Sequence, residues 1–204
     1  RIKDSYKHAL VLYKIAIIQC DEKVYMESEV SSIKALSILI GLKETNEINK
    51  LKSYLYNNLG IVHSELGLNE EAIKYYNESL KLKRKLKGDF KLKIYNSINN
   101  LAYAYKSSGK YDLARSEERR VVKDNNFINE TPYFYVMVLD NYAHSLYLSN
   151  QHEQLPKLYL KALKICYNEN TIYESIILHQ HLAEYYQAYN KKDSALYHGY
   201  KAKE

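Results

Sequence analysis

The residues whose spacing most suggests a role in binding are polar side chains that recur along the chain at a nearly fixed interval. Asn58, Asn100, Asn141 and His181 follow one another at intervals of 42, 41 and 40 residues. A carboxamide offers both a hydrogen-bond donor and an acceptor, which matches the alternating groups of an extended peptide backbone. This ladder therefore predicts a surface that binds a peptide.

Neighbouring positions extend the ladder into a wider candidate surface. On a helix, residues three and four positions apart share a face, so the flanking polar and aromatic residues are expected beside the ladder. The candidate partner-binding residues are Asn57, Asn58, Asn99, Asn100, Tyr103, Asp140, Asn141, His144, Tyr147, Gln180, His181 and Glu184. The same polar residues could instead tie neighbouring helices together or be simply solvated. Both alternatives stay open at this point.

The chain offers little that could carry catalysis. His179 and His181 are two residues apart, so on a helix they point to different sides and do not chelate one metal easily. His63 occupies a packing position and is expected to be a core histidine. No glycine-rich phosphate loop, nucleophile elbow or zinc motif is present. We therefore expect no enzyme, no catalytic residues, no metal and no cofactor.

Composition and charge leave a second class of partner to consider. Hydrophobic residues make up 46% of the 204 residues and charged residues 26%, as in a folded soluble protein. The net charge of +6 raises the possibility of nucleic acid, through a basic edge from Lys81 to Lys93 with Arg115, Arg119, Arg120 and Lys123. Cations near the end of a helix are more simply explained by the helix dipole. Nucleic-acid binding therefore remains an alternative, as does self-association.

A repeated skeleton specifies the elements that carry these residues. One copy reads Tyr56-x-x-Leu59-Gly60-x-x-His63, which is the spacing of an amphipathic helix face. The small residue at its centre, which would let a second helix approach closely, recurs as Gly60, Ala102, Ala143 and Ala183. A turn follows each copy at Gly67, Gly109, Asn150 and Asn190, residue types that tolerate the left-handed conformation. Each unit should then continue into a second helix.

These patterns predict an all-α chain of about five antiparallel helical hairpins, forming a right-handed α-solenoid. Thr131 and Pro132 are expected as the N-cap and the first residue of a helix. The hairpins form one array over residues 1–204, with a divergent capping hairpin at 1–41 and repeats at 51–87, 92–124, 132–167 and 172–204.

The repeats resemble the tetratricopeptide repeat, whose pattern of a bulky residue, Leu-Gly, Tyr, then Ala and an aromatic is followed from about residue 54 to the end. The interval of 40 to 42 exceeds the usual ~34, as in the lengthened repeats of kinesin light chains. Two local sequences are most similar to those of sensor regions of Bacteroidota regulatory proteins. They are Leu59-Gly60-Ile61-Val62 and Asp193-Ser194-Ala195-Leu196-Tyr197.

This resemblance implies a scaffold whose first helices line a concave groove, with the asparagine ladder holding ligand backbone. It also implies an attached DNA-binding or histidine-kinase module. Repeats that bind chaperone tails use a basic carboxylate clamp, but the corresponding positions here, such as Asn57, Asn99 and Ile61, carry no such charge.

The ends of the sequence bear on the cellular setting. The chain begins at Arg1 and stops within a helical pattern at Glu204, so we expect a piece of a longer protein. The compartment, cytoplasmic or periplasmic, would then be decided by segments outside this sequence. The expected partner is a protein or peptide in the groove, without membrane contact in this segment, and oligomers are possible.

Overall fold

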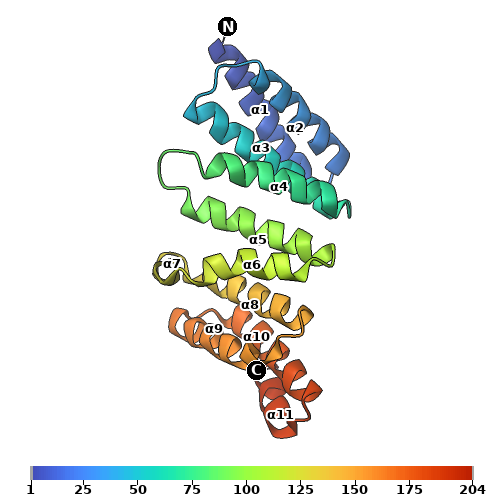
Figure 1. Ribbon diagram of the computed structural model, residues 1–204, viewed down its shortest axis with the longest axis vertical. Helices are drawn as coiled ribbons and strands as arrows, with labels where there is room; N and C mark the ends of the chain where they lie inside the picture. The colour runs from blue at the N-terminus through green and yellow to red at the C-terminus, as the bar shows by residue number, and fades with distance from the viewer. Residues whose placement is uncertain (1, 204) are drawn as a thin grey trace. The chain divides into compact units, whose positions relative to one another are not determined.

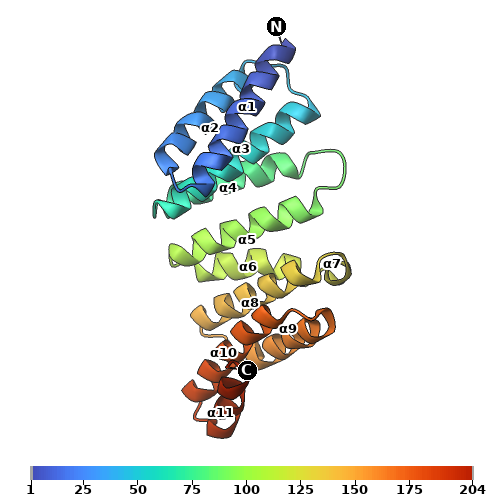
Figure 2. The same cartoon turned by 180° about the vertical axis from the view of Figure 1, so that it is seen from behind.

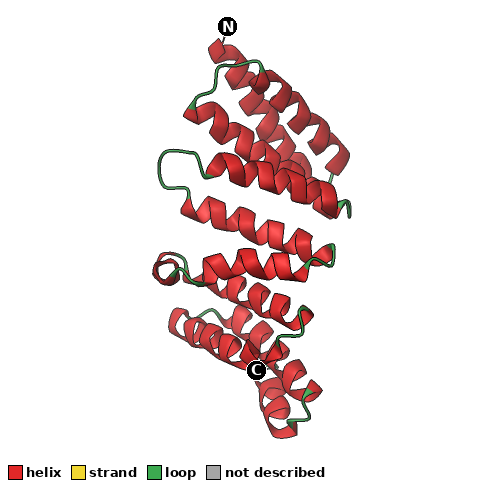
Figure 3. Ribbon diagram, viewed as in Figure 1, coloured by secondary structure: helices red, strands yellow, loops and turns green. Residues whose placement is uncertain are grey.

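The chain is described by a computed structural model over residues 2–203, and the regular elements there are all helical (Figure 3). The predicted all-α class is therefore confirmed. The elements are α1 (Ile2–Asp21), α2 (Tyr25–Ile40), α3 (Asn46–Glu65), α4 (Asn69–Lys83), α5 (Lys91–Ser107), α6 (Tyr111–Val122), α7 (Asn125–Glu130), α8 (Pro132–Leu148), the 3₁₀ turn η1 (His152–Gln154), α9 (Leu155–Glu169), α10 (Ile172–Ala188) and α11 (Lys192–Lys201).

These helices group into two compact units, Arg1–Lys110 and Tyr111–Glu204, which are described separately. The division falls inside the repeat predicted at 92–124, between α5 and α6. A single array over residues 1–204 stays a prediction.

The first unit contains two complete helical pairs and the helix α5. Helices α1 and α2 pack against each other, α3 contacts α1, α2 and α4, and α5 lies against α4 (Figures 1 and 2). The pair α1 and α2 occupies the segment predicted as a capping hairpin. Its apolar faces join those of α3 in one core, formed by Ala9, Ala35, Leu36, Leu39, Ile48, Leu51, Leu55 and Leu59.

The second unit pairs α8 with α9 and α10 with α11, while α6 packs against α8. The short helix α7 was not predicted from the sequence. Asp124 caps it by accepting a hydrogen bond from the Asn126 backbone, and Phe127 anchors it in the core. The Phe127 ring lies 5.6 Å from that of Phe134 in an edge-on arrangement. This packing turns the link between α6 and α8 into a helix.

One turn geometry ends five of the described helices, α1, α3, α5, α8 and α10. The residues at the turn all have positive φ: Lys23 (61°), Gly67 (76°), Gly109 (72°), Asn150 (58°) and Asn190 (56°). After each of them, the next backbone N–H donates to a carbonyl five residues back, as from Leu68 to His63 and from Gln151 to Leu146, both at 2.8 Å. This is the Schellman arrangement. The four turns predicted at Gly67, Gly109, Asn150 and Asn190 are confirmed, and Lys23 places the first pair in the same register.

A close helix crossing explains the small residue of the repeat. A Cβ atom built on Gly60 would lie 2.5 Å from Cε1 of Tyr76, a residue that is 2% exposed. The corresponding residues Ala102 and Ala143 are fully buried, whereas Ala183 in the last pair is half-buried. At Gly60, side-chain volume is thus limited by the crossing helix α4.

The predicted start of α8 is correct in position but not in its hydrogen bond. Thr131 is the N-cap residue and Pro132 follows in the first turn. The Thr131 hydroxyl, however, caps no backbone N–H of α8 and is buried without a partner among the described residues. Its backbone, at φ −149° and ψ 72°, differs from the extended geometry of Thr45, which does cap α3. Proline alone therefore marks this helix start.

The Gly60 crossing yields a stability test. We expect Gly60→Ala to lower the free energy of unfolding by about 1–3 kcal/mol, because the added methyl group overlaps the Tyr76 ring. Denaturant unfolding followed by circular dichroism measures the change.

Gly199→Ala is the matched control, since both glycines lie within helices. Its Cβ atom would come no closer than 4.0 Å to Ala183, so the better helix propensity of alanine, worth up to about 1 kcal/mol, should leave stability unchanged or raised. Equal stability of Gly60→Ala and the wild type would contradict the close crossing.

Candidate peptide-binding site

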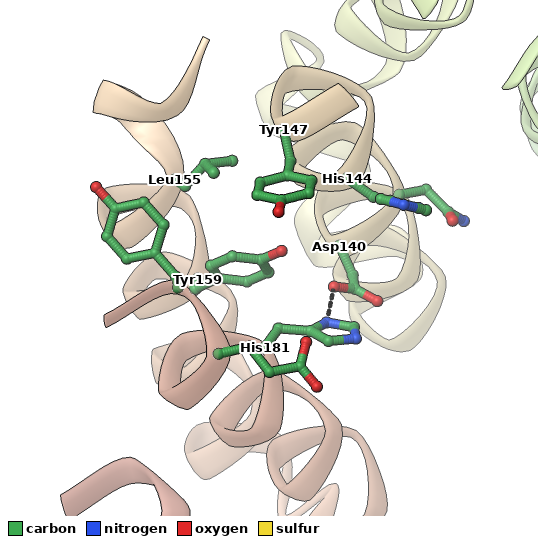
Figure 4. Close-up of a pocket in the computed structure, with 9 residues that line it drawn as sticks. Asp140, His144, Tyr147, Leu155, Tyr159 and His181 are labelled. Carbon is green, nitrogen blue, oxygen red and sulfur yellow. Dashed lines mark hydrogen bonds and ion pairs between the residues drawn. The ribbon is translucent and has the colours of Figure 1, made fainter. Parts of the chain in front are cut away.

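Six of the predicted partner-binding residues converge on one cavity in the second unit. The cavity holds about 230 Å³ and opens between α8, α9 and α10 (Figure 4). The lining residues that were predicted to bind a partner are Asp140, Asn141, His144, Tyr147, His181 and Glu184. Leu155, Tyr159 and Tyr185 complete the lining. The structure thus brings together side chains that lie about 40 residues apart in the sequence.

Helix geometry explains why these side chains meet. On α8, Ala143 and Leu146 are buried and face the packed interior, while Asp140 and Tyr147 flank that face. On α10, His181 holds the position that Asn141 holds on α8, and it precedes the buried Leu182. The polar candidate residues therefore border the buried faces of α8 and α10. There they can line a cavity and still reach solvent.

A hydrogen bond joins the two helices across the cavity. The Asp140 carboxylate lies 2.7 Å from Nδ1 of His181, as the dashed line in Figure 4 marks. The hydrogen bond to Asp140 raises the pKa of His181; burial opposes this effect, and the charges of Asp140 and Glu184 add to it. Acidification from neutral pH therefore strengthens this contact, because His181 gains its proton above the pH at which a free imidazole would.

Aromatic rings form much of the remaining wall. Tyr147 is 48% exposed, whereas Tyr159 is almost fully buried. The Tyr159 ring lies 5.8 Å from that of His181. Burial, then the charges of Asp140 and Glu184, raise the pKa of Tyr159, so it remains a neutral hydrogen-bonding phenol. The cavity therefore combines π-faces with two carboxylates.

The first unit contains a second cavity, which takes in two predicted residues. Asn57 and Asn100 line it, and its volume is about 320 Å³. Asn58 is a correction to the candidate set. Only 6% of it is exposed, and its amide donates to Ser28 at 3.0 Å and to Ser32 at 3.1 Å on α2. The amide is occupied in tying α3 to α2, so Asn58 is structural.

The remaining three candidates stand outside these cavities. Asn99, Tyr103 and Gln180 line neither of them. Tyr103 is 58% exposed and Gln180 is also exposed, so both are open to solvent within their own unit. Their part in partner binding stays a prediction.

Sequence reasoning missed several lining residues. Tyr159 carried a signal, because it is the aromatic of the repeat skeleton, but that pattern indicates core packing. Lys83 and Lys93 line the cavity of the first unit, whereas the sequence pattern places both on the basic edge. The heptad-like series Ala72, Tyr76 and Ser79, all buried, continues to Lys83 and could have revealed that its side chain turns inward.

The histidines outside the cavity have packing partners. His63 is buried, lies 3.1 Å from the Glu29 carboxylate and packs on Tyr75, which fits a core residue. Nδ1 of His179 lies 2.7 Å from Nδ1 of His198 in the interface of α10 and α11. Among the described residues, no three His, Cys, Asp or Glu side chains come together as a metal site. None of the helices described is long and apolar enough to cross a bilayer.

The basic edge is less uniform than its sequence suggests. In the first unit, Lys81 is exposed and lies 3.6 Å from Glu78, whereas Lys83 is buried. In the second unit, Arg115 pairs with Asp112 and Arg120 with Glu117, each at 3.0 Å. Neighbouring acids thus offset several of these cations. Nucleic-acid binding remains an untested alternative.

Comparison with solved structures identifies the fold. BtubC from P. vanneervenii superposes with a TM-score of 0.77 at 16% identity, covering 100% of this chain and 88% of that one. A putative kinesin light chain from Podosopora anserina with nearly identical TPR-like repeats gives 0.76 at 14% identity, covering 95% and 92%. A double mutant of MamA from RS-1 gives 0.69 at 16% identity, covering 96% and 92%.

The sequence itself carries the family pattern over part of its length. No curated protein matches it significantly. The tetratricopeptide repeat family model matches residues 51–123, within the stretch where the repeat skeleton was found. Residues 51–123 are thus tetratricopeptide repeats, and the fold of the chain is that of the tetratricopeptide-repeat proteins.

Proposed function

We propose that the chain is a protein- or peptide-binding scaffold or sensor domain, and that the cavity between α8, α9 and α10 receives part of an extended peptide. The observation that carries this proposal is the convergence of six of the predicted partner-binding residues on one cavity. A tetratricopeptide-repeat fold is in general a protein-interaction scaffold, which agrees with the proposal. We assign no catalytic step to it.

The size of the cavity favours a side chain over a free small molecule. Its volume of about 230 Å³ is below the ~300 Å³ at which pockets for drug-sized ligands begin. A side chain of the partner could enter the cavity while the carboxamide of Asn141 hydrogen-bonds the adjoining backbone. The affinity would then come from one anchored residue and the peptide groups around it.

The lining favours a basic anchor residue. Asp140 and Glu184 supply negative charge, and Tyr147, Tyr159 and Tyr185 supply aromatic faces. Lysine and arginine are attracted by both kinds of group. We therefore propose a peptide with a lysine or arginine at the anchor position. Binding would in turn control an attached DNA-binding or kinase module, as the resemblance to regulatory proteins implies.

The cavity residues provide the direct test of this function. Peptides are first selected on the wild-type chain from a displayed library of random linear sequences. For a selected peptide, we expect Asn141→Ala and Tyr147→Ala each to weaken binding about tenfold or more, because each removes a contact at the centre of the site. Isothermal titration calorimetry measures the dissociation constants.

Asn168→Ala and Tyr200→Ala are the matched controls, since they remove the same side-chain types from exposed positions outside the cavity. They should leave the affinity unchanged. Selection of no linear peptide, or equal losses in cavity and control variants, would remove this function.

The charge of His181 makes the binding of a basic peptide pH-dependent. Its pKa is raised by Asp140, so His181 gains a proton as the pH falls from 8 to 6. The imidazolium then offsets the Asp140 charge, and the affinity should fall roughly threefold to fivefold over this range.

Titration at both pH values with a lysine-containing peptide measures the effect. His181→Gln should reduce the pH dependence, because it removes the imidazole that gains the proton. A basic peptide that binds wild-type protein more tightly at pH 6 would contradict this reading of the site.

A further inference from the structure

A second cavity, in the first unit, has the opposite chemical character. It is lined by Tyr13, Tyr54, Asn57, Lys83, Lys93, Asn96 and Asn100, which come from α1, α3, α4 and α5. The lining thus contains two amines, three carboxamides and two phenols. No Asp or Glu is among these described lining residues.

Lys83 is buried at a position that other helical pairs fill with uncharged side chains. Counted from the turn of each pair, Lys83 corresponds to Leu39 on α2 and Cys166 on α9. Those two residues are buried in their cores, and Lys83 is only 4% exposed. Burying an ammonium group is costly unless polar groups surround it. The repeat fold therefore does not require a lysine here.

The amine of Lys83 is hydrogen-bonded by its surroundings and still faces the cavity. Nζ donates to the Ser97 hydroxyl and, at 3.4 Å, to the Asn57 side-chain oxygen. It also lies 5.8 Å from the centre of the Tyr54 ring. Each of these partners is neutral, so the positive charge has no buried counter-charge among them. Burial, followed by the nearby charge of Lys93, lowers the pKa of Lys83 to about 8.

The other lining residues reinforce this character. Lys93 is exposed and adds a second positive charge, and Asn96 and Asn100 add amide donors on the same helix. At the corresponding positions of α10, the second unit has Glu174 for Lys93 and Ile177 for Asn96, and the cleft that those residues line is about 110 Å³. The cationic, amide-rich lining is therefore specific to the first unit.

We propose that this cavity is an oxyanion-binding site, which takes a carboxylate or phosphate group carried on a peptide. Lys83 and Lys93 would supply the charge, and the carboxamides of Asn96 and Asn100 would donate hydrogen bonds to the anion or to the backbone beside it. A volume of about 320 Å³ is larger than a bare ion needs, and carboxamides beside the amines suit the backbone next to an anionic residue. The site stands independently of the peptide cavity between α8, α9 and α10.

Binding of an anion should be coupled to the protonation of Lys83. The groups that face its amine are Tyr13 of α1, Tyr54 and Asn57 of α3, and Lys93 of α5, and the pKa values of both phenols are raised. The tyrosines therefore stay neutral near pH 8, and Lys83 is the group that loses a proton there. The anion should bind more weakly as the pH rises from 7 to 9, because the amine loses its charge.

Nuclear magnetic resonance of the Lys83 Nζ group in the whole chain tests the proposal. The probes are three blocked alanine-based peptides that differ at one residue, which is glutamate, phosphoserine or glutamine. We expect at least one of the two anionic peptides to raise the pKa of Lys83 from about 8, and the glutamine peptide to leave it unchanged. An effect of phosphoserine alone would identify phosphate as the natural group, and an effect of glutamate alone would identify carboxylate. No shift with either anionic peptide at millimolar concentration overturns the proposal.

Three variants distinguish binding in this cavity from a general effect of positive charge on the protein. Lys83→Met should fold, because Leu39 and Cys166 fill the corresponding positions, and should weaken binding of the anionic peptide about tenfold. Lys93→Gln, at an exposed position, should also weaken it, which keeps the test valid if Lys83→Met is unstable. Lys81→Met removes the same charge from the same helix outside the cavity and should have no effect. Equal losses from Lys81→Met and Lys93→Gln would also overturn the proposal.

Discussion

The arrangement of both units depends on the close crossing of the two helices within each pair. At Gly60 the approach is so close that a single methyl group would overlap the ring of Tyr76. The left-handed residue that ends each first helix, from Lys23 to Asn190, sets the register of this crossing. Together they fix which positions of a first helix are buried and which border the neighbouring first helix. The positions of the polar candidate residues follow from this constraint.

The same register carries different chemistry in the two units. Between α8 and α10 the bordering positions hold Asp140 and His181, joined by a 2.7 Å hydrogen bond. Between α3 and α5 they hold Asn57 and Asn100, which lie beside the buried amine of Lys83. One cavity is therefore acidic and aromatic, and the other is basic and rich in amides. A repeat scaffold can vary such residues, because they border the buried core that holds the helices together and are not part of it.

Local patterns made much of this predictable. The turn residues were evident because glycine and asparagine tolerate positive φ, and the cavity residues from Asp140 to Glu184 followed from helix periodicity. The features that the sequence did not predict correctly depend on tertiary contacts that a single sequence does not reveal. Asn58 has the residue type of the ladder, but Ser28 and Ser32 on another helix occupy its amide. Likewise, α7 forms where Phe127 packs against Phe134. Lys23 shows that a turn can be left-handed without glycine or asparagine, provided that its hydrogen bonds are retained.

The proposed function requires that the cavity between α8, α9 and α10 receives a peptide. Backbone and side-chain chemical shifts of the labelled chain, followed during titration with a selected linear peptide, test it most directly. We expect the largest changes at Asn141, Tyr147, His181 and Glu184, and little change in α11 residues such as Tyr200. Changes centred on α11, with the cavity residues unaffected, would contradict it.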